Sequence, residues 1–328
     1  MHKYFSTIME YITNQYSNES LLIAISGGQD SICLVKLMNN FDLKEKKCKQ
    51  IDYIHIDHQW TKESKKQAEY IISYLKSLRK KVSIYQIKKT SLSEKISRLY
   101  RYHIIINHAI RYKYRIVLTA HTKTDKIETF FLNLIRGTTT EGTTALNLCR
   151  MIGHKTMLGR PLIYMDRQFT KFICRKYFLP LWSDNSNYNY SIKRNRVRNE
   201  LIPYLRKYYN KKIDNNVLNF LNNCKYNNEY IKQKIIKTYL QHKHDKYVAL
   251  NHKCLKKQHI IMQVKIIQFF LYHSINLFIN KSRLISFINQ LKKVKDKKCF
   301  TLVSNNISIL GTNQWIYLRY HNISILNN

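Results

Sequence analysis

The chain has 328 residues, 44% of them hydrophobic, and it carries 57 Lys and Arg residues against 20 Asp and Glu residues. This length and apolar content suggest two domains with buried cores, and the 12% aromatic content together with few Gly and Pro excludes a disordered chain. The net charge of +37 is typical of a protein that binds a polyanion, either nucleic acid or an anionic membrane surface. An AT-rich coding bias toward Lys and Asn explains part of this charge, but the scarcity of Asp and Glu favours nucleic acid.

The cysteines and the amino terminus narrow the setting in which the protein works. None of the seven cysteines forms a CxxC pair, which argues against a disulfide framework or a zinc site and favours a reducing compartment. The first residues lack the apolar segment of a secretory signal, and no run of 18 apolar residues occurs, so we expect no membrane partner. We expect an organelle-encoded protein of the plastid stroma, or otherwise a protein of the bacterial cytoplasm.

The first half of the chain alternates short β-branched runs with helical patterns. We predict strands at residues 21–25, 51–56, 82–87 and 115–120, and helices at residues 31–39, 61–79, 94–112 and 123–135. Such alternation predicts an α/β fold, a doubly wound parallel sheet of the Rossmann-like kind. Because ligands of these sheets bind at the carboxyl ends of the strands, the polar residues that follow each strand are the candidate site.

Beyond about residue 200 the pattern becomes mainly helical. We predict helices over residues 200–240 and 260–291, and a hairpin or small sheet over 300–320. We place the domain boundary near residue 205, with a catalytic domain at 1–205 and a mainly helical RNA-contacting domain at 206–328. Interleaved Tyr and Lys from Tyr204 to Tyr230 suit stacking on splayed bases and contacts with phosphates. A surface helix shaped by AT-rich coding explains the same composition, so both interpretations stay open.

A glycine-containing turn follows the first predicted strand and leads into its helix. It consists of Ser26, Gly27, Gly28, Gln29, Asp30 and Ser31. The glycines allow a tight turn and a close approach to a ligand, and the free N–H groups of the helix start favour an anion. A carboxylate beside a phosphate needs an intervening cation, so Asp30 is a candidate Mg²⁺ ligand. The alternative is an ordinary turn in which Asp and Ser cap the helix.

The SGGQDS string resembles the PP-loop of the N-type ATP pyrophosphatases, a family that cleaves ATP between its α and β phosphates and adenylates a substrate. Further segments resemble one branch of that family, the tRNA(Ile)-lysidine synthetases. They are HIDH at 55–58, RLYRY at 98–102, AHTKTDKIET at 120–129 with RGT at 136–138, GRPL at 159–162, and RNRVRNELIP at 194–203. One departure is Thr122, where the family often has a second His.

The resemblance implies an activity and a set of roles. ATP with Mg²⁺ would adenylate a cytidine of tRNA(Ile) bearing a CAU anticodon, and the ε-amine of free L-lysine would then displace AMP. The phosphate loop and His58 would bind ATP, with Asp30 and Asp125 as candidate Mg²⁺ ligands and His121 on phosphate. Asp125 and Glu128 would contact the lysine amine, unless they merely complement the helix dipole. The predicted substrate or tRNA contacts are Arg98, Arg101, Arg136, Arg160, Arg194, Arg196 and Arg198.

Two other functions compete with this interpretation. A tRNA thiolase of the same superfamily would need a persulfide-carrying cysteine, and Cys149 is the cysteine nearest in sequence to the block at 120–138, although no paired cysteine accompanies it. The second competing function is a tRNA-binding protein with an inactive ATP site, although the intact SGGQDS string argues against it. The residues alone leave open the identity of the amine, the tRNA position and whether the enzyme forms a homodimer.

Overall fold

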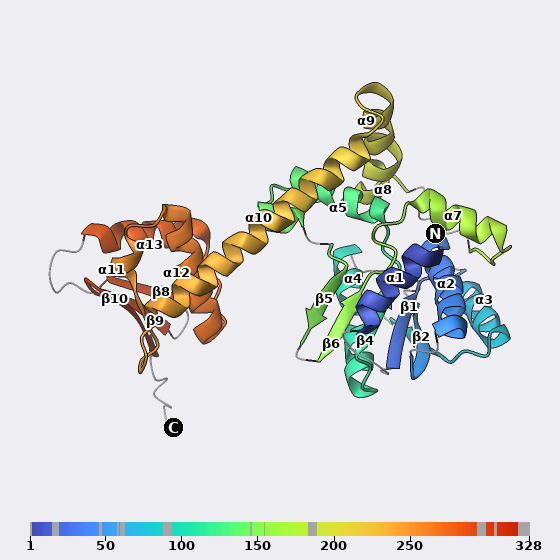
Figure 1. Cartoon of the computed structure of the whole chain (residues 1–328), viewed down its shortest axis with the longest axis horizontal. Helices are drawn as coiled ribbons and strands as arrows, with labels where there is room; N and C mark the ends of the chain where they lie inside the picture. The colour runs from blue at the N-terminus through green and yellow to red at the C-terminus, as the bar shows by residue number, and fades with distance from the viewer. Residues whose placement is uncertain are drawn as a thin grey trace. The chain divides into compact units, whose positions relative to one another are not determined.

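The computed structural model describes residues 2–14, 20–45, 48–57, 59, 63–87, 94–144, 146–153, 155–182, 189–293, 300–304 and 307–320. The chain divides into two compact units, residues 1–224 and 225–328, as the ribbon in Figure 1 shows. The long helix α10 (Ile213–His242) contributes its first part to one unit and its last part to the other. The functional boundary near residue 205 stays a prediction.

The first unit is built on a six-stranded sheet with the strand order β3-β2-β1-β4-β6-β5. Its strands are β1 (Ser20–Ile25), β2 (Gln50–Asp57), β3 (Val82–Gln86), β4 (Ile116–Thr119), β5 (Cys149–Ile152) and β6 (Thr156–Gly159). The neighbours in this order pair in parallel, except that β5 runs antiparallel to β6. The predicted doubly wound sheet is therefore confirmed, and the β5–β6 pair extends it beyond the four strands that the sequence indicated.

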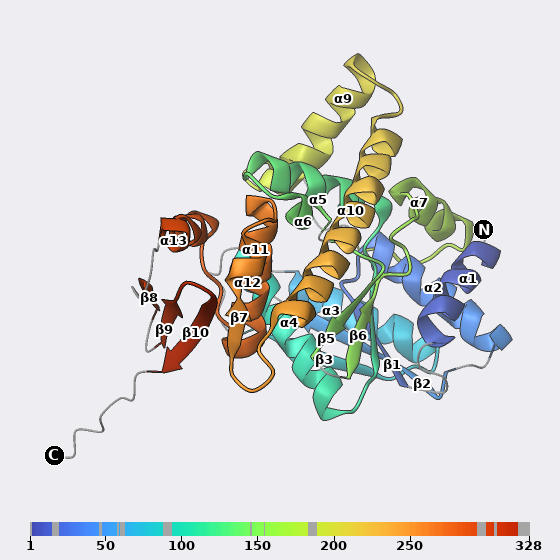
Figure 2. The same ribbon diagram turned by 60° about the vertical axis from the view of Figure 1, so that its left-hand side comes forward.

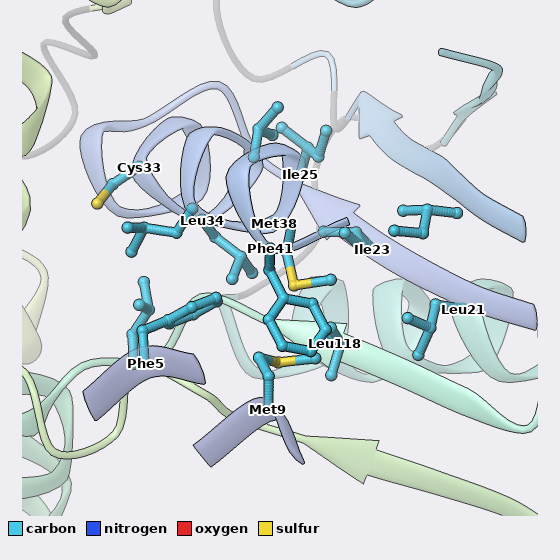
Figure 3. Close-up of a cluster of buried hydrophobic side chains, with 14 of the residues drawn as sticks. Phe5, Met9, Leu21, Ile23, Ile25, Cys33, Leu34, Met38, Phe41 and Leu118 are labelled. Atoms are coloured by element: carbon cyan, nitrogen blue, oxygen red, sulfur yellow. The ribbon is translucent and has the colours of Figure 1, made fainter. Parts of the chain in front are cut away.

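Successive residues of β1 point to opposite faces of the sheet, and both faces are covered. Leu21 and Ile23 pack in one buried cluster with α1 (His2–Asn14) and α2 (Gln29–Glu45), which Figure 3 shows, whereas Leu22 belongs to a cluster on the other face. The other helices of the first unit up to residue 176 are α3 (Ser64–Ser77), α4 (Glu94–Arg111), α5 (Lys123–Ile135), α6 (Thr140–Thr143) and α7 (Arg167–Lys176), and α4 packs in the cluster on the other face. Burial on both faces explains why the strands are continuous apolar runs.

The first unit ends in a helical arm. It contains α8 (Lys193–Arg196), a π-helical turn η2 (Val197–Leu201), α9 (Ile202–Tyr208) and the start of α10, and Figure 2 shows α9 and α10 as neighbours. A small apolar cluster joins this arm to α5. Its buried members are Ile127, Phe130, Val197, Ile202, Val217 and Leu221.

The second unit combines helices with a four-stranded antiparallel sheet of order β7-β10-β9-β8. Its elements are β7 (Ala249–Asn251), α11 (His252–Leu255), α12 (Ile260–Ile275), α13 (Lys281–Lys293), β8 (Phe300–Ser304), β9 (Ile307–Gly311) and β10 (Trp315–Tyr320). The single helix predicted over 260–291 is broken at Asn276, which ends α12 in a left-handed conformation. Within the described ranges, no helix has the length and apolar character needed to cross a membrane.

Candidate nucleotide and substrate site

A pocket of about 370 Å³ lies at the carboxyl ends of β1, β2 and β4. Its lining includes the phosphate loop from the first strand, Asp57 after the second, and His121 with Asp125 after the fourth. The strand order changes direction here, because β1 connects to β2 on one side and pairs with β4 on the other. This is the crevice where ligands bind in open α/β sheets. The pocket thus lies where the sequence predicts a site, and residues at the ends of three predicted strands line it.

The phosphate loop has its turn already formed. Gly27 has a φ of +79°, and a Cβ there would lie 2.9 Å from Cδ1 of Ile71, so both the conformation and the space favour glycine. The Ser31 N–H donates to the Gly28 carbonyl at 3.0 Å and its hydroxyl donates to the same oxygen at 2.8 Å. Gln67 of α3 donates to the Ser26 carbonyl at 2.9 Å. The start of α2 is therefore held open toward the pocket.

Asp30 is buried and held by α7, a helix that the sequence did not indicate. Arg167 donates to its Oδ2 at 3.0 Å, and the Thr170 hydroxyl donates to its Oδ1 at 2.5 Å. Gln29 reaches the same helix, donating to the Arg167 carbonyl at 2.9 Å and to Thr170 Oγ1 at 2.8 Å. Burial raises the pKa of Asp30, and the Arg167 guanidinium and the Thr170 hydrogen bond oppose that rise. Two consecutive loop residues are thereby fixed by distant partners.

The donor set at Asp30 fits one kind of metal site. Among the residues that the structure describes, no group of three or more His, Cys, Asp or Glu side chains is arranged to hold a metal ion. Mg²⁺ commonly binds through one or two carboxylates, several waters and the phosphates of a substrate, and does not need a cage made by protein alone. Asp30 and Asp125 both line the pocket and can serve in that way once phosphates are present.

His121 is a neutral imidazole at the end of β4. Its Nδ1 lies 3.0 Å from the hydroxyl of Thr119. Shielding from water lowers the pKa of His121 to about 3; Asp125 opposes this shift, while Arg160, Arg98 and Arg194 add to it. The imidazole can therefore exchange hydrogen bonds with a ligand without changing its charge near neutral pH. His58, the other predicted histidine, lies outside the described residues.

The acid–arginine cluster consists of Asp125, Glu128, Arg194 and Arg198. Arg194 donates to Glu128 at 2.8 Å and to Asp125 at 2.9 Å, and Arg198 donates to the two oxygens of Glu128 at 2.5 and 2.8 Å. The Glu128 side chain has 0% exposure, and this residue is absent from the pocket lining, whereas Asp125 contributes to it. Glu128 therefore positions two arginines and does not face the pocket itself.

Asp125 is kept ionised within this cluster. Burial acts to raise its pKa, but Arg194, the Thr122 backbone N–H and Arg167 outweigh burial and lower the pKa to about 2. Thr122 caps α5, and its N–H and hydroxyl donate to Asp125 Oδ2 at 2.9 and 3.0 Å. The Thr122 side chain, which departs from the family pattern, thus has a clear local role. It orients the carboxylate that faces the pocket.

The three arginines of the RNRVR string do not act alike. All three, Arg194, Arg196 and Arg198, are predicted from the sequence as substrate or tRNA contacts. The structure makes this segment helical, so Arg194 and Arg198 lie one turn apart and both point to the buried acids. Arg196 points elsewhere and forms an exposed pair with Glu200 at 3.0 Å. The structure therefore has an inward pair and one outward residue in this string, and their contacts with tRNA stay a prediction.

The other predicted arginines are divided between the pocket and the surface. Arg101 lines the pocket together with Tyr102, and the Arg98 guanidinium lies 5.5 Å from the Tyr102 ring centre. Arg160 is buried at the end of β6 and donates to the Asn147 carbonyl at 2.7 Å. Arg136 is exposed at the end of α5 and is absent from the pocket lining.

Sequence reasoning missed Arg167, Thr170, Gln67 and Thr119 as partners of the predicted site residues. Each one contacts a motif residue, yet none stands in a motif itself. The only local signal was Gln29 and Asp30 themselves, two polar side chains that become buried at the start of a helix and therefore need partners.

The strand order, the glycine turn and the polar strand ends define an ATP-binding α/β domain of the PP-loop class. A family profile described as a PP-loop domain matches residues 1–205. The fold resembles that of the U34-tRNA thiolase NcsA from Methanococcus maripaludis, with a TM-score of 0.55 at 14% identity over 67% of this chain and 78% of that one.

Curated relatives specify the family further. The chain is 40% identical over 97% of its length to the chloroplastic tRNA(Ile)-lysidine synthase of Gracilaria tenuistipitata var. liui, covering 98% of that protein. It is 34% identical to the chloroplastic tRNA(Ile)-lysidine synthase of Pyropia yezoensis, over 97% of this chain and 95% of that protein. A tRNA(Ile)-lysidine synthase from Nostoc sp. matches at 36% identity over 59% of this chain and 56% of that protein. The chain belongs to the tRNA(Ile)-lysidine synthase family.

Proposed function

We propose that this enzyme uses ATP to join free L-lysine to C2 of the wobble cytidine in the CAU anticodon of tRNA(Ile). The product, lysidine, changes codon reading from AUG to AUA. The observation that carries the proposal is near-full-length similarity to lysidine synthases combined with an intact phosphate loop at a strand-end pocket. The net charge of +37 suits an RNA substrate.

The first step is adenylation of the RNA. The cytidine O2 attacks the α-phosphate of ATP, and pyrophosphate leaves. The start of α2 lines the pocket at Gly28, Gln29 and Asp30, where backbone N–H groups would meet the phosphates, and His121 offers a neutral hydrogen-bonding ring. Asp30 would hold Mg²⁺ together with the phosphates, and the ion would supply neutralisation of their charge. Arg167 is placed to keep the Asp30 carboxylate in one orientation toward the pocket.

The second step is displacement of AMP by the lysine ε-amine at C2. Asp125 is the acid that lines the pocket, and its low pKa keeps it negative, which suits contact with the lysine ammonium. We assign Glu128 the supporting role of holding Arg194 and Arg198, because its carboxylate is buried and fully engaged by them. Arg101 at the pocket wall is a candidate contact for the lysine carboxylate or an RNA phosphate.

The thiolase alternative receives less support from the cysteines. Cys149 is half-buried at the start of β5, and burial raises the pKa of its thiol, which disfavours the reactive thiolate. We further propose that the protein works in the plastid stroma and is encoded in the organelle, because relatives of nearly equal length are chloroplastic. Formation of a homodimer stays a prediction.

The test is incorporation of radiolabelled lysine into tRNA(Ile) with a CAU anticodon, in the presence of ATP and Mg²⁺. We expect stable label that requires ATP, and a loss of at least about 100-fold in the Asp30→Asn variant, since the charge stabilisation of the reacting phosphates is removed. Asp30→Asn should still bind the tRNA. The control is Glu200→Gln, which alters only an exposed ion pair. ATP-dependent release of pyrophosphate without lysine label would leave the adenylation step intact and refute lysine as the amine.

A further inference from the structure

Three exposed tyrosines gather where α9 ends. Tyr204, Tyr208 and Tyr209 are 52%, 62% and 73% exposed. The ring centre of Tyr204 lies 4.9 Å from that of Tyr208 and 5.9 Å from that of Tyr209. We name this group the tyrosine platform. Its rings contact one another and still present most of their surface to solvent.

The backbone beneath the platform is firmly held. Arg206 donates to both oxygens of Asp214 at 3.2 and 2.7 Å, which ties α9 to the start of α10. The N–H groups of Tyr209 and Asn210 both donate to the Leu205 carbonyl, at 3.1 and 2.9 Å, and close the helix end. The tyrosines are therefore preorganised, and a ligand would not have to order them.

The surroundings of the platform are positively charged. The segment from residue 204 to residue 212 contains Arg206, Lys207, Lys211 and Lys212 and no acid. The Lys207 ammonium lies 4.9 Å from the Tyr208 ring centre, close enough for a cation–π contact. Exposed aromatic faces interleaved with basic side chains are the combination that binds unpaired nucleotides, because bases stack and phosphates pair with cations. Two copies of this chain meeting here would bring like charges together, which disfavours self-association.

The platform is connected to the catalytic pocket by one helical run. Arg198 of the acid–arginine cluster and Tyr204 are six residues apart in η2 and α9, and Tyr208 is four residues further. At about 1.5 Å per residue, these tyrosines lie roughly 9 and 15 Å from Arg198 along the helix axis. Stacked nucleotides advance by about 3.4 Å each, so this span corresponds to roughly three to four nucleotides.

We propose that Tyr204, Tyr208 and Tyr209 stack on unpaired bases of the substrate RNA that flank the nucleotide held in the pocket. This inference rests on the proposed function only in taking RNA as the substrate. The platform fixes the position of the loop along the enzyme, and the pocket then receives the reactive base. The platform raises the affinity for RNA and takes no part in adenylation or lysine transfer.

The experiment compares the double variant Tyr204→Ala/Tyr208→Ala with Tyr204→Phe/Tyr208→Phe in the full-length protein. The probe is a stem–loop RNA with a CAU loop that carries 2-aminopurine about three nucleotides from the target cytidine, the distance that the helical span sets. Each lost stacking contact weakens affinity several-fold or more, so we expect binding to the alanine variant to be about 10- to 100-fold weaker and the phenylalanine variant to bind as the parent does. Quenching of 2-aminopurine by the parent should disappear in the alanine variant.

Matched controls separate stacking from other effects. Tyr112 is 53% exposed and comes before the amino end of β4, whereas the pocket lies at the carboxyl ends of the strands. Tyr112→Ala should therefore leave RNA binding unchanged. Neither alanine variant should weaken binding to a duplex of the same length that has no loop. Three results for the double alanine variant would overturn the proposed role of the platform. They are an equal loss of affinity for the loop and the duplex, unchanged affinity for the loop, or loss of a dimer with unchanged RNA binding.

The outcomes also distinguish this inference from the proposed function. If the parent binds the loop but attaches no lysine, the proposed function fails while the binding comparison still decides the platform. If lysine transfer occurs, the alanine variant should raise the KM for RNA and keep kcat at saturating RNA. A lower kcat with an unchanged KM would instead place the tyrosines in the chemical steps and refute the platform.

Discussion

The phosphate loop and the acid–arginine cluster differ in how they prepare for a charged ligand. The loop offers backbone N–H groups and hydroxyls around a left-handed Gly27, and its one carboxylate is turned toward Arg167 and Thr170. The cluster instead contains two acids and two arginines, whose hydrogen bonds join residues 66 to 73 positions apart. The loop depends on backbone geometry, whereas the cluster depends on full charges that already neutralise one another.

This difference indicates how each part contributes to the reaction. Backbone donors at a helix start bind an anion without bringing a formal countercharge, which suits the phosphates of ATP. In the cluster, Arg194 and Arg198 balance the buried acids, so Asp125 stays ionised without leaving a net charge in the interior. A cationic ligand approaching Asp125 meets a carboxylate that is fixed in place. The loop thus binds an anion through backbone dipoles, whereas the cluster holds a charged carboxylate in a fixed orientation.

The comparison is tested most strongly by removing the charge of Glu128. Glu128→Gln keeps the shape but leaves Arg194 and Arg198 without their bidentate acceptor, so we expect unfolding to become easier by about 3–5 kcal/mol. Urea unfolding of the first unit measures this change. Glu200→Gln is the matched control, because its pair with Arg196 is exposed and contributes at most about 1 kcal/mol. Equal losses in the two variants would show that the cluster stabilises no more than a surface pair does.

The glycine turn is tested by two neighbouring substitutions. Gly27→Ala places a Cβ at a positive φ and 2.9 Å from Ile71, so we expect a loss of about 1–2 kcal/mol in stability. At Gly28 a Cβ meets only the Ser26 hydroxyl at 3.6 Å, an ordinary contact. Gly28→Ala should therefore keep the melting temperature while it raises the KM for ATP by obstructing the phosphates. Identical melting temperatures for the two variants would contradict a strained turn at Gly27.

The response of protein stability to pH tests the environment of His121. Its folded-state pKa of about 3 lies below the unfolded value of about 6.5, so at acidic pH the unfolded chain binds the extra proton. The free energy of unfolding that the neutral His121 contributes above pH 6.5 is therefore lost as the pH falls toward 3. Between pH 6 and 4, the parent should lose up to about 1.4 kcal/mol per pH unit more than His121→Gln does. Denaturant unfolding at several pH values measures the two slopes, and parallel slopes would refute a neutral, shielded His121.

The parts predictable from sequence were those whose determinants lie close together in the chain. The strands were recognisable because both sheet faces are buried, and the phosphate loop because six consecutive residues form it. Helix α7 was missed because its packing on Asp30 depends on residues 137 and 140 positions away. The inward direction of Arg194 and Arg198 also required the fold, since spacing alone does not show that the segment is helical. The catalytic roles given to these residues stay predictions.

The π-helical turn at Val197–Leu201 contains Arg198 of the acid–arginine cluster and precedes the tyrosine platform. Such a turn corresponds to one residue inserted into an α-helix, and one residue rotates everything beyond it by about 100°. A change of length in this segment therefore rotates the helix beyond it, which a change of length in a surface loop does not do. A relative that lacks one residue here would keep a continuous helix yet present its aromatic residues in another direction. Insertions and deletions between residues 197 and 201, more than substitutions, are the changes that would alter which RNA loops the family accepts.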